Sequence, residues 1–139
     1  MLAQDLGDYL TSQSGGTLTQ GTNLFLGARP PTPDACLTVY ETGGLPPVHA
    51  FNPAAGQAKV EMARVQVVAR AAGEDYEAAR LLAHRAFVLL DGLPSRSING
   101  VAYKWGAAIQ SPFLMGRDEQ SRLLVACNFD IVKELSTTS

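Results

Sequence analysis

The sequence predicts an α+β fold, in which an antiparallel or mixed sheet of four to five strands carries two α-helices packed on one face. Apolar residues recur at helical spacing near the N-terminus and again over 76–90, while apolar runs typical of strands fill the segments between and after them. The predicted order is a helix, three strands, a second helix and two strands. This order argues against a doubly wound parallel sheet.

The N-terminal segments combine a short amphipathic helix with two brief strands. A helix is expected over 2–12, and the Ser-Gly-Gly sequence at 14–16 ends it. Its apolar residues share one face: Leu2, Leu6, Tyr9 and Leu10. Strands are expected at 23–27 and 36–41, where apolar, β-branched and aromatic residues predominate. The proline-rich cluster 29–34 separates them, because proline lacks the N–H donor that a strand ladder needs.

The central strand and the second helix carry the clearest patterns. In the expected strand 64–70, Val65, Val67 and Ala69 alternate with polar residues and are expected to face the core. A helix is expected over 76–90, with Asp75 as its N-cap. The side chains expected to line its core-facing side are Tyr76, Ala79, Ala83, Ala86, Phe87 and Leu90.

Two further strands are expected in the C-terminal third, at 101–110 and 123–132, with a turn at 116–119 between them. In the first strand, Tyr103 and Trp105 are expected to share one face. In the second strand, the residues expected to face the core are Leu123, Val125, Cys127, Phe129 and Ile131. These two strands would complete the sheet.

The length of 139 residues suits a single domain spanning 1–139. Its most irregular part is 43–61, which contains three prolines and three glycines. A loop this long in a compact domain is uncommon, and a loop that contacts a partner is favoured over a loose connector. The C-terminal residues 133–139 are expected to be loosely held.

Composition excludes several classes of protein. The net charge of −2 provides no general positive field for nucleic acid, and no apolar run reaches the roughly 20 residues that span a bilayer. The N-terminus lacks the basic residues of a signal peptide, so the chain is expected to be made in the cytoplasm without a membrane partner. The charged fraction of 17% is low, which favours a surface covered by other subunits. Cys36 and Cys127 are expected to be buried, reduced thiols.

The residue patterns contain no catalytic, cofactor-binding or metal site. His49 and His84 lie far apart in the sequence, and neither has a second ligand at metal-binding spacing. There is no Gly-x-Ser-x-Gly elbow and no glycine-rich phosphate loop. We therefore expect that the protein is not an enzyme. A small ligand-binding or hydrolase domain remains the alternative from another class, and it would require a concave pocket with converging polar groups.

Four segments, taken in order, resemble the minor capsid and tail-terminator family of long-tailed bacteriophages. They are the passage 26–44, the strand 64–70, the helix sequence DYEAARLLAHRAF, and the turn 116–119 leading into 124–131. The similarity covers roughly residues 1–133. No single motif is diagnostic, and the order and spacing of the four segments carry the resemblance.

The resemblance implies a virion protein that forms a homohexameric ring at the head-proximal end of the tail. Such a ring stops growth of the tail tube and presents a surface to the head-completion or connector proteins. Its partners would be copies of itself, the tail tube protein and the connector, and DNA could pass through its lumen without sequence recognition. The family implies no catalytic residue and no cofactor. The alternative within this class is another head–tail connector or tail completion protein.

A closed ring uses a heterologous contact, so each subunit needs two different complementary patches. One patch is expected in the loop at 46–53 and the other in the segment 111–122. The candidate interface residues are Pro46, Pro47, Val48, His49, Phe51, Pro53, Phe113, Met115, Arg117 and Arg122. Arg64 and Arg70 are candidates for a basic surface lining a DNA passage, and ordinary solvation and salt bridging is the alternative for them.

Overall fold

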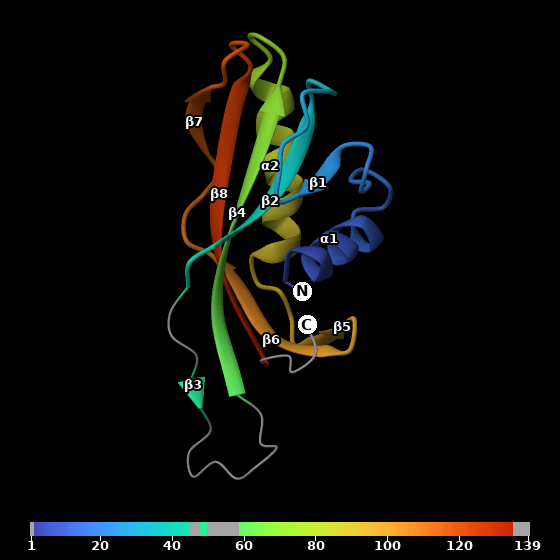
Figure 1. Cartoon of the computed structure of the whole chain (residues 1–139), viewed down its shortest axis with the longest axis vertical. Helices are drawn as coiled ribbons and strands as arrows, with labels where there is room; N and C mark the ends of the chain where they lie inside the picture. Colours follow the sequence, from blue (N-terminus) through green and yellow to red (C-terminus); the bar gives the residue numbers. More distant parts are fainter. Residues whose placement is uncertain (1, 45–47, 50–58, 135–139) are drawn as a thin grey trace.

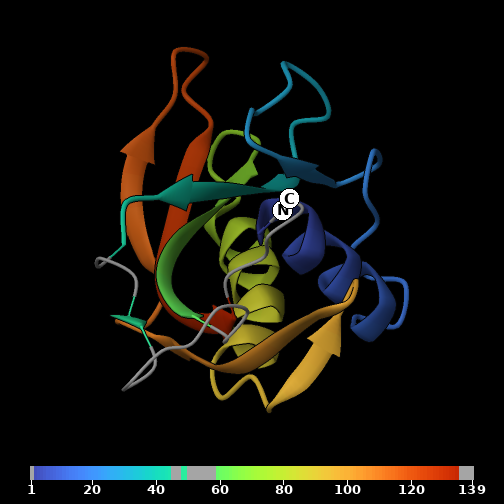
Figure 2. The same cartoon turned by 60° about the horizontal axis from the view of Figure 1, so that its bottom comes forward.

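The computed structural model describes residues 2–44, 48–49 and 59–134 as a curled sheet with two helices inside it. The sheet bends strongly, and both helices lie within its concave side (Figure 1, Figure 2). The α+β class with two helices is confirmed. The predicted count of four to five strands is wrong, because the sheet has eight strands in the described part of the chain.

The helices and strands follow one another as α1 (Leu2–Gln13), β1 (Leu24–Leu26), β2 (Cys36–Thr42), β3 (Val48–His49), β4 (Lys59–Ala71), α2 (Tyr76–Leu90), β5 (Arg96–Ile98), β6 (Val101–Ala108), β7 (Phe113–Arg117) and β8 (Leu123–Glu134). The main strand order is β1-β2-β4-β8-β6-β5, while β3 pairs with β4 and β7 pairs with β8. Only the β1–β2 pair among the described strands is parallel, so the sheet is mixed.

The three strands that the sequence did not predict are β3, β5 and β7, each five residues or shorter. Such short strands carry too few residues for an alternating pattern to stand out. They form because a longer neighbour offers unpaired main-chain groups: β3 pairs with the start of β4, and β7 pairs with the start of β8. Their existence depends on tertiary pairing more than on local sequence.

The antiparallel pair of β4 and β8 forms the longest ladder of the sheet. It runs from Val60 opposite Glu134 to Ala71 opposite Leu123. Alternate residues of both strands face the helices, as predicted, and each is at most 8% exposed. They are Ala63, Val65, Val67, Ala69 and Ala71 on β4, and Leu123, Val125, Cys127, Phe129 and Ile131 on β8.

Helix α2 covers the inner face of this ladder. The Asp75 side chain accepts a hydrogen bond from the Ala78 N–H at 3.1 Å, which confirms the predicted N-cap. The buried stripe consists of Ala79, Leu82, Ala83, Ala86 and Leu90. Tyr76 was expected in this stripe but is 42% exposed, and Phe87 is only half-buried. At roughly 100° per residue, both lie at the margin of the stripe instead of its centre.

Strand β6 corrects the expectation that Tyr103 and Trp105 share a face. Tyr103 is fully buried, whereas Trp105 is 45% exposed. The register against β8 shifts between these two residues, so Lys104 is an extra residue that rotates Trp105 outward. Gly106 then faces the core, where an added Cβ would lie 2.9 Å from Ile131 Cδ1. The bulge therefore decides which β6 side chains remain on the surface.

Helix α1 is tied to the sheet through a buried carboxylate. Asp5 is 2% exposed and accepts a hydrogen bond from the Tyr103 hydroxyl at 2.7 Å. Asn99 Nδ2 donates to Asp5 Oδ1 at 2.9 Å and to Asp8 Oδ2 at 2.8 Å. Burial, together with the nearby Asp5 carboxylate, raises the pKa of Tyr103 well above its usual value. The network joins the first helix to β6 and the β5–β6 turn.

The two cysteines are buried and free, as expected. Cys36 lies opposite Arg70, and Cys127 lies opposite Val67, so β4 separates the strands that carry them. Burial raises the pKa of Cys36, and burial with the nearby Asp91 carboxylate raises the pKa of Cys127 to about 11. Both thiols therefore stay protonated near neutral pH and are poor nucleophiles.

Removing the Tyr103 hydroxyl tests the anchor of α1. Hydrogen bonds to charged groups contribute about 1.5–3 kcal/mol, so Tyr103→Phe should lower the free energy of unfolding by about 2 kcal/mol in a urea titration. Tyr76→Phe, at a tyrosine that is 42% exposed, is the matched control. Its effect should stay within about 0.5 kcal/mol. Equal effects of the two substitutions would contradict a stabilising role for the Asp5–Tyr103 bond.

Candidate functional site

Within the described residues, no group of three or more His, Cys, Asp or Glu side chains could hold a metal ion. No helix in this part of the chain has the length and apolar character needed to cross a membrane. His84 is exposed on α2, with its ring stacked on Phe87 at a centroid distance of 6.2 Å. What the described surface does present is a charged cleft and two groups of exposed apolar side chains.

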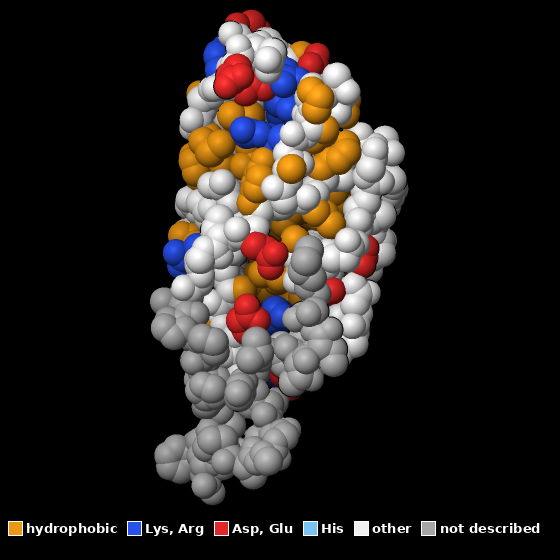
Figure 3. Space-filling model, viewed as in Figure 1, with side chains coloured by type: hydrophobic (Ala, Val, Ile, Leu, Met, Phe, Trp, Pro, Cys, Tyr) orange, Lys and Arg blue, Asp and Glu red, His pale blue; other side chains and the backbone are white. Residues whose placement is uncertain are grey.

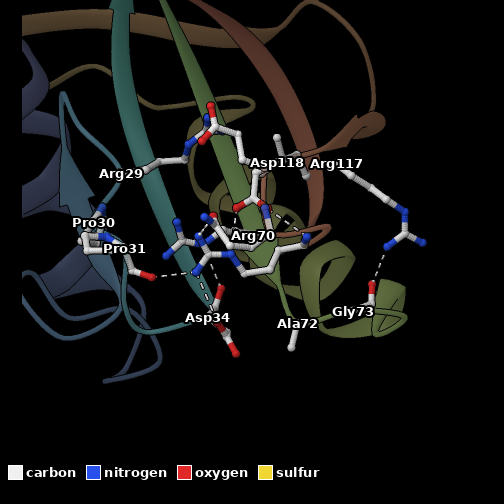
Figure 4. Close-up of a pocket in the computed structure, with 13 residues that line it drawn as sticks. Arg29, Pro30, Pro31, Asp34, Arg70, Ala72, Gly73, Arg117 and Asp118 are labelled. Atoms are coloured by element: carbon white, nitrogen blue, oxygen red, sulfur yellow. Dashed lines mark hydrogen bonds and ion pairs between the residues drawn. The ribbon is translucent and has the colours of Figure 1, made fainter.

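The cleft lies at one end of the molecule, at the top of Figure 1, and has a volume of about 870 Å³. Three segments that are distant in sequence meet there: the proline-rich loop 29–34, the turn between β4 and α2, and the turn between β7 and β8 (Figure 4). Its charged lining residues are Arg29, Asp34, Arg70, Arg117, Asp118, Glu119 and Arg122. Four of these are arginines, so the question is whether their donors are available to a ligand.

Arg122 is committed to contacts within the chain. Its Nε donates to Asp118 Oδ2 at 2.8 Å, and its Nη1 donates to the Pro31 carbonyl at 2.7 Å and to Asp34 Oδ1 at 3.2 Å. Its Nη2 donates to Gln120 at 3.1 Å. The side chain is 10% exposed. Arg122, predicted as an interface residue, therefore acts as an ionic clasp between the loop 29–34 and the β7–β8 turn.

Arg70 also contacts the loop 29–34 at this end of the molecule. It is 2% exposed, and it donates to the carbonyls of Pro33 at 2.6 Å and Asp34 at 3.1 Å. Its guanidinium is thus covered by the loop in this subunit. Arg64, the other candidate for a basic surface, remains 43% exposed and pairs with Asp130 at 2.9 Å. The structure does not bring these two arginines together as an open basic patch.

Asp118 organises the turn that carries the clasp. Burial alone would raise the pKa of its carboxyl group, but the backbone N–H and side chain of Arg122 and the N–H of Gln120 hold that pKa below its usual value. The two N–H groups each donate to Asp118 Oδ1 at 2.9 Å. The sequence predicts a turn at 116–119, and in the structure the Asp118 side chain holds this turn together.

The remaining candidates in 111–122 all lie on β7. Phe113 is half-buried and packs against the cluster of Val68, Leu124 and Ala126 on the outer face of the sheet. Met115 is 41% exposed. Arg117 is engaged with Glu74 at 3.2 Å and with the Gly73 carbonyl at 3.0 Å. Of the predicted residues on this strand, Met115 is the most accessible apolar one.

The other predicted patch lies largely outside the described residues. The residues of this patch that lie outside the described part of the chain are Pro46, Pro47, Phe51 and Pro53. Val48 and His49 form β3, for which the structure describes the backbone pairing with β4.

Exposed large apolar side chains were mostly missed by the sequence reasoning. In the described part of the chain they are Tyr76, Leu81, Val88, Trp105, Ile109, Leu114 and Met115. One group belongs to α2 and the other to β6, β7 and the segment that joins them. Figure 3 shows apolar side chains gathered on the outer face of the sheet, below the charged end. A signal existed for α2, because Leu81 and Val88 fall outside its buried stripe and make the helix apolar on two sides.

Comparisons with known proteins agree with a structural role. A family model described as bacteriophage tail terminator protein matches residues 4–135, which is nearly the whole chain. A solved chain from the virion of a native gene transfer agent particle is 17% identical, with a TM-score of 0.51; the match covers 91% of this chain and 84% of that chain. At this identity the likeness shows the fold alone.

A second solved chain is 15% identical with a TM-score of 0.47, over 94% of this chain and 89% of that chain. No curated protein sequence matches the chain.

The ionic clasp can be tested by its pH dependence. The folded-state pKa of Asp118 lies below the ordinary value of 3.8, so the carboxylate contributes stability above that pH and loses it as the pH falls through the lowered pKa. Asp118→Asn should therefore lower Tm by a few degrees at neutral pH, and the difference from the wild type should shrink as the pH falls progressively below 3.8. Glu119→Gln, in the same turn, is the control and should leave Tm nearly unchanged. If the Tm deficit of Asp118→Asn stays the same from neutral pH down through the acidic range, the Asp118 carboxylate does not stabilise the fold through the clasp.

Proposed function

Because this chain belongs to the bacteriophage tail terminator family, we propose that it forms a homohexameric ring that caps the tail tube and joins it to the head-completion complex. The family assignment makes it a structural component of the virion, located in the tail, and not an enzyme. The observation that carries the proposal is the match of the family model over residues 4–135.

The surface chemistry supports assembly over catalysis. The arginines at the charged cleft are largely engaged with internal acceptors, as Arg122 and Arg70 illustrate, so few donors converge on a ligand. By contrast, Leu114 and Met115 on β7 are 53% and 41% exposed. In the described part of the chain β7 pairs only with β8, so its other edge is open. An apolar strand with an open edge is typical of a surface that another chain covers.

We propose that the segments 46–53 and 111–122 contact neighbouring subunits or the tube. The segment 111–122 contributes the exposed side chains of β7, while its clasp at Arg122 holds the turn in place. A stiff turn favours a defined contact, since less conformational freedom is lost when the ring closes.

The lumen of such a ring must let DNA pass without holding it. Arg64 is the accessible candidate for a lumen residue, and its partner Asp130 at 2.9 Å offsets its charge. Phosphate contacts by unpaired arginines strengthen binding to any DNA sequence. A lumen wall on which Arg64 is already paired with Asp130 would bind DNA weakly and without regard to sequence, which suits the passage of DNA through the ring.

A phage lacking this chain separates the terminator role from that of another head–tail connector. Loss of a terminator removes the stop on tube growth, so electron microscopy should show overlong or unjoined tails beside filled heads. Supplying the wild-type chain from a plasmid should restore uniform tail length. Tails of normal length together with heads that leak their DNA would contradict the terminator role and favour a connector.

A further inference from the structure

We propose that the outer face of α2 in one subunit docks on the β6–β7 ribbon of the next copy in the ring. The α2 ridge is defined here as Tyr76, Leu81, His84 and Val88, and the β6–β7 ribbon as the exposed side chains of Trp105, Ile109, Leu114 and Met115. This inference rests on the proposed ring and assigns the two halves of its subunit contact.

The α2 ridge is a largely apolar helix face that no other described part of the subunit covers. Leu81 is 50% exposed and Val88 is 55% exposed, on the side of α2 opposite its buried stripe. Leu81, His84 and Val88 are three or four residues apart, so they align along one face of the helix. A helix with apolar side chains both toward the core and away from it is typical of one buried on two sides.

Hollows flank the α2 ridge on both sides. One of about 520 Å³ is lined by Tyr76, Glu77, Arg80, Leu81 and His84. The other, of about 150 Å³, lies between α2 and the end of α1 and is lined by Gln13, Ser14, Thr17, Arg85, Val88 and Leu89. A ridge between two hollows is a shape into which the side chains of a partner can interlock.

The β6–β7 ribbon is the second exposed apolar group and lies in the sheet layer. Trp105 faces outward because of the bulge at Lys104, and Ile109 follows the end of β6 with 46% exposure. Leu114 and Met115 lie farther along the same edge of β8, on β7, whose outer edge has no partner strand in the described residues. Leu114 is opposite Val125 and so projects from the helix side of the sheet, whereas Trp105 is opposite Val132 and projects from the outer face. The ribbon thus offers apolar side chains beside unpaired main-chain groups.

The number and kind of these surfaces indicate a second copy as the occupant. Every large exposed apolar side chain in the described ranges belongs either to the α2 ridge or to the β6–β7 ribbon. A heterologous ring contact uses two different surfaces on each subunit, one for each neighbour. The helix layer supplies one surface and the sheet layer the other, so a single type of contact would cover both.

Charge favours the same pairing. Arg80 and Arg85 flank the α2 ridge, and neither has an ion pair in the described structure. Glu77, at the N-terminal end of the helix, is also without an ion pair there, and the positive end of the helix dipole stabilises its charge. On the ribbon side, Lys104 pairs with Glu134, and Arg117 pairs with Glu74. Glu119, in the turn after β7, is left without an ion pair among the described residues. The α2 ridge therefore has two unpaired arginines and one unpaired glutamate beside it, an excess of one positive charge, and the end of the ribbon carries the unpaired Glu119.

A twofold contact between two α2 ridges fits less well. It would place Arg80 and Arg85 of one copy near the same residues of the other, where like charges repel. It would also pair subunits in twos, because an isologous contact uses the same surface on both partners and does not by itself build a six-membered ring.

Photo-crosslinking in assembled particles tests this contact. A benzophenone amino acid replaces Leu81 in one particle preparation and Val88 in another. Irradiation should give a product of about twice 14.8 kDa, and mass spectrometry should join an α2 peptide to a peptide from 105–115 of a second copy. The same probe at Leu114 should return α2 peptides. A probe at Ser95, an exposed position outside both surfaces, should give neither product.

Several outcomes would overturn the inference while leaving the ring intact. These are crosslinks from Leu81 and Val88 to another virion protein, crosslinks between two α2 ridges, or no crosslink in tails that contain the chain. If the chain is absent from the head-proximal end of the tail, the proposed function itself fails, and the docking assignment fails with it.

Discussion

The antiparallel ladder between β4 and β8 is the constraint on which the rest of the structure depends. Its twelve residue pairs connect the two halves of the chain, and the other strands attach to it directly or through one neighbour. Because side chains alternate between the faces of a strand, the ladder sends one set inward against α2 and leaves the other set on the outer face. The same ladder therefore builds the main core on its inner face and the smaller buried cluster of Val68, Leu124 and Ala126 on its outer face.

The charged end of the molecule and its apolar surfaces differ in whether their side chains find partners among the described residues. Polar groups at the charged end find partners within the subunit, as Arg122 does with Asp118 and the Pro31 carbonyl. The apolar groups on α2 and on the ribbon of β6 and β7 stay exposed in the described part of the chain. Such a distribution leaves little for a small ligand to bind and much for another protein to cover. It is what a subunit of a permanent assembly requires, and it agrees with a family of structural virion proteins.

Long periodic segments could be predicted from the sequence, and features that depend on tertiary contact could not. The alternation in β4 and the Asp75 cap of α2 appear locally, and the structure confirms both. The exposure of Trp105 depends on a bulge against β8, which no local pattern reveals. Arg70 and Arg122 looked like surface residues because their acceptors, carbonyls of the distant loop 29–34, come near only on folding.

A cryo-electron microscopy reconstruction of the head–tail junction is the most direct test of the account. If the chain is a ring subunit, the reconstruction should contain six copies of it in one closed ring between the tube and the connector. Each copy should have α2 toward one neighbour and β7 toward the other. A junction in which this chain is missing, or in which its copies do not touch one another, would contradict the claim that its surface is built for self-assembly.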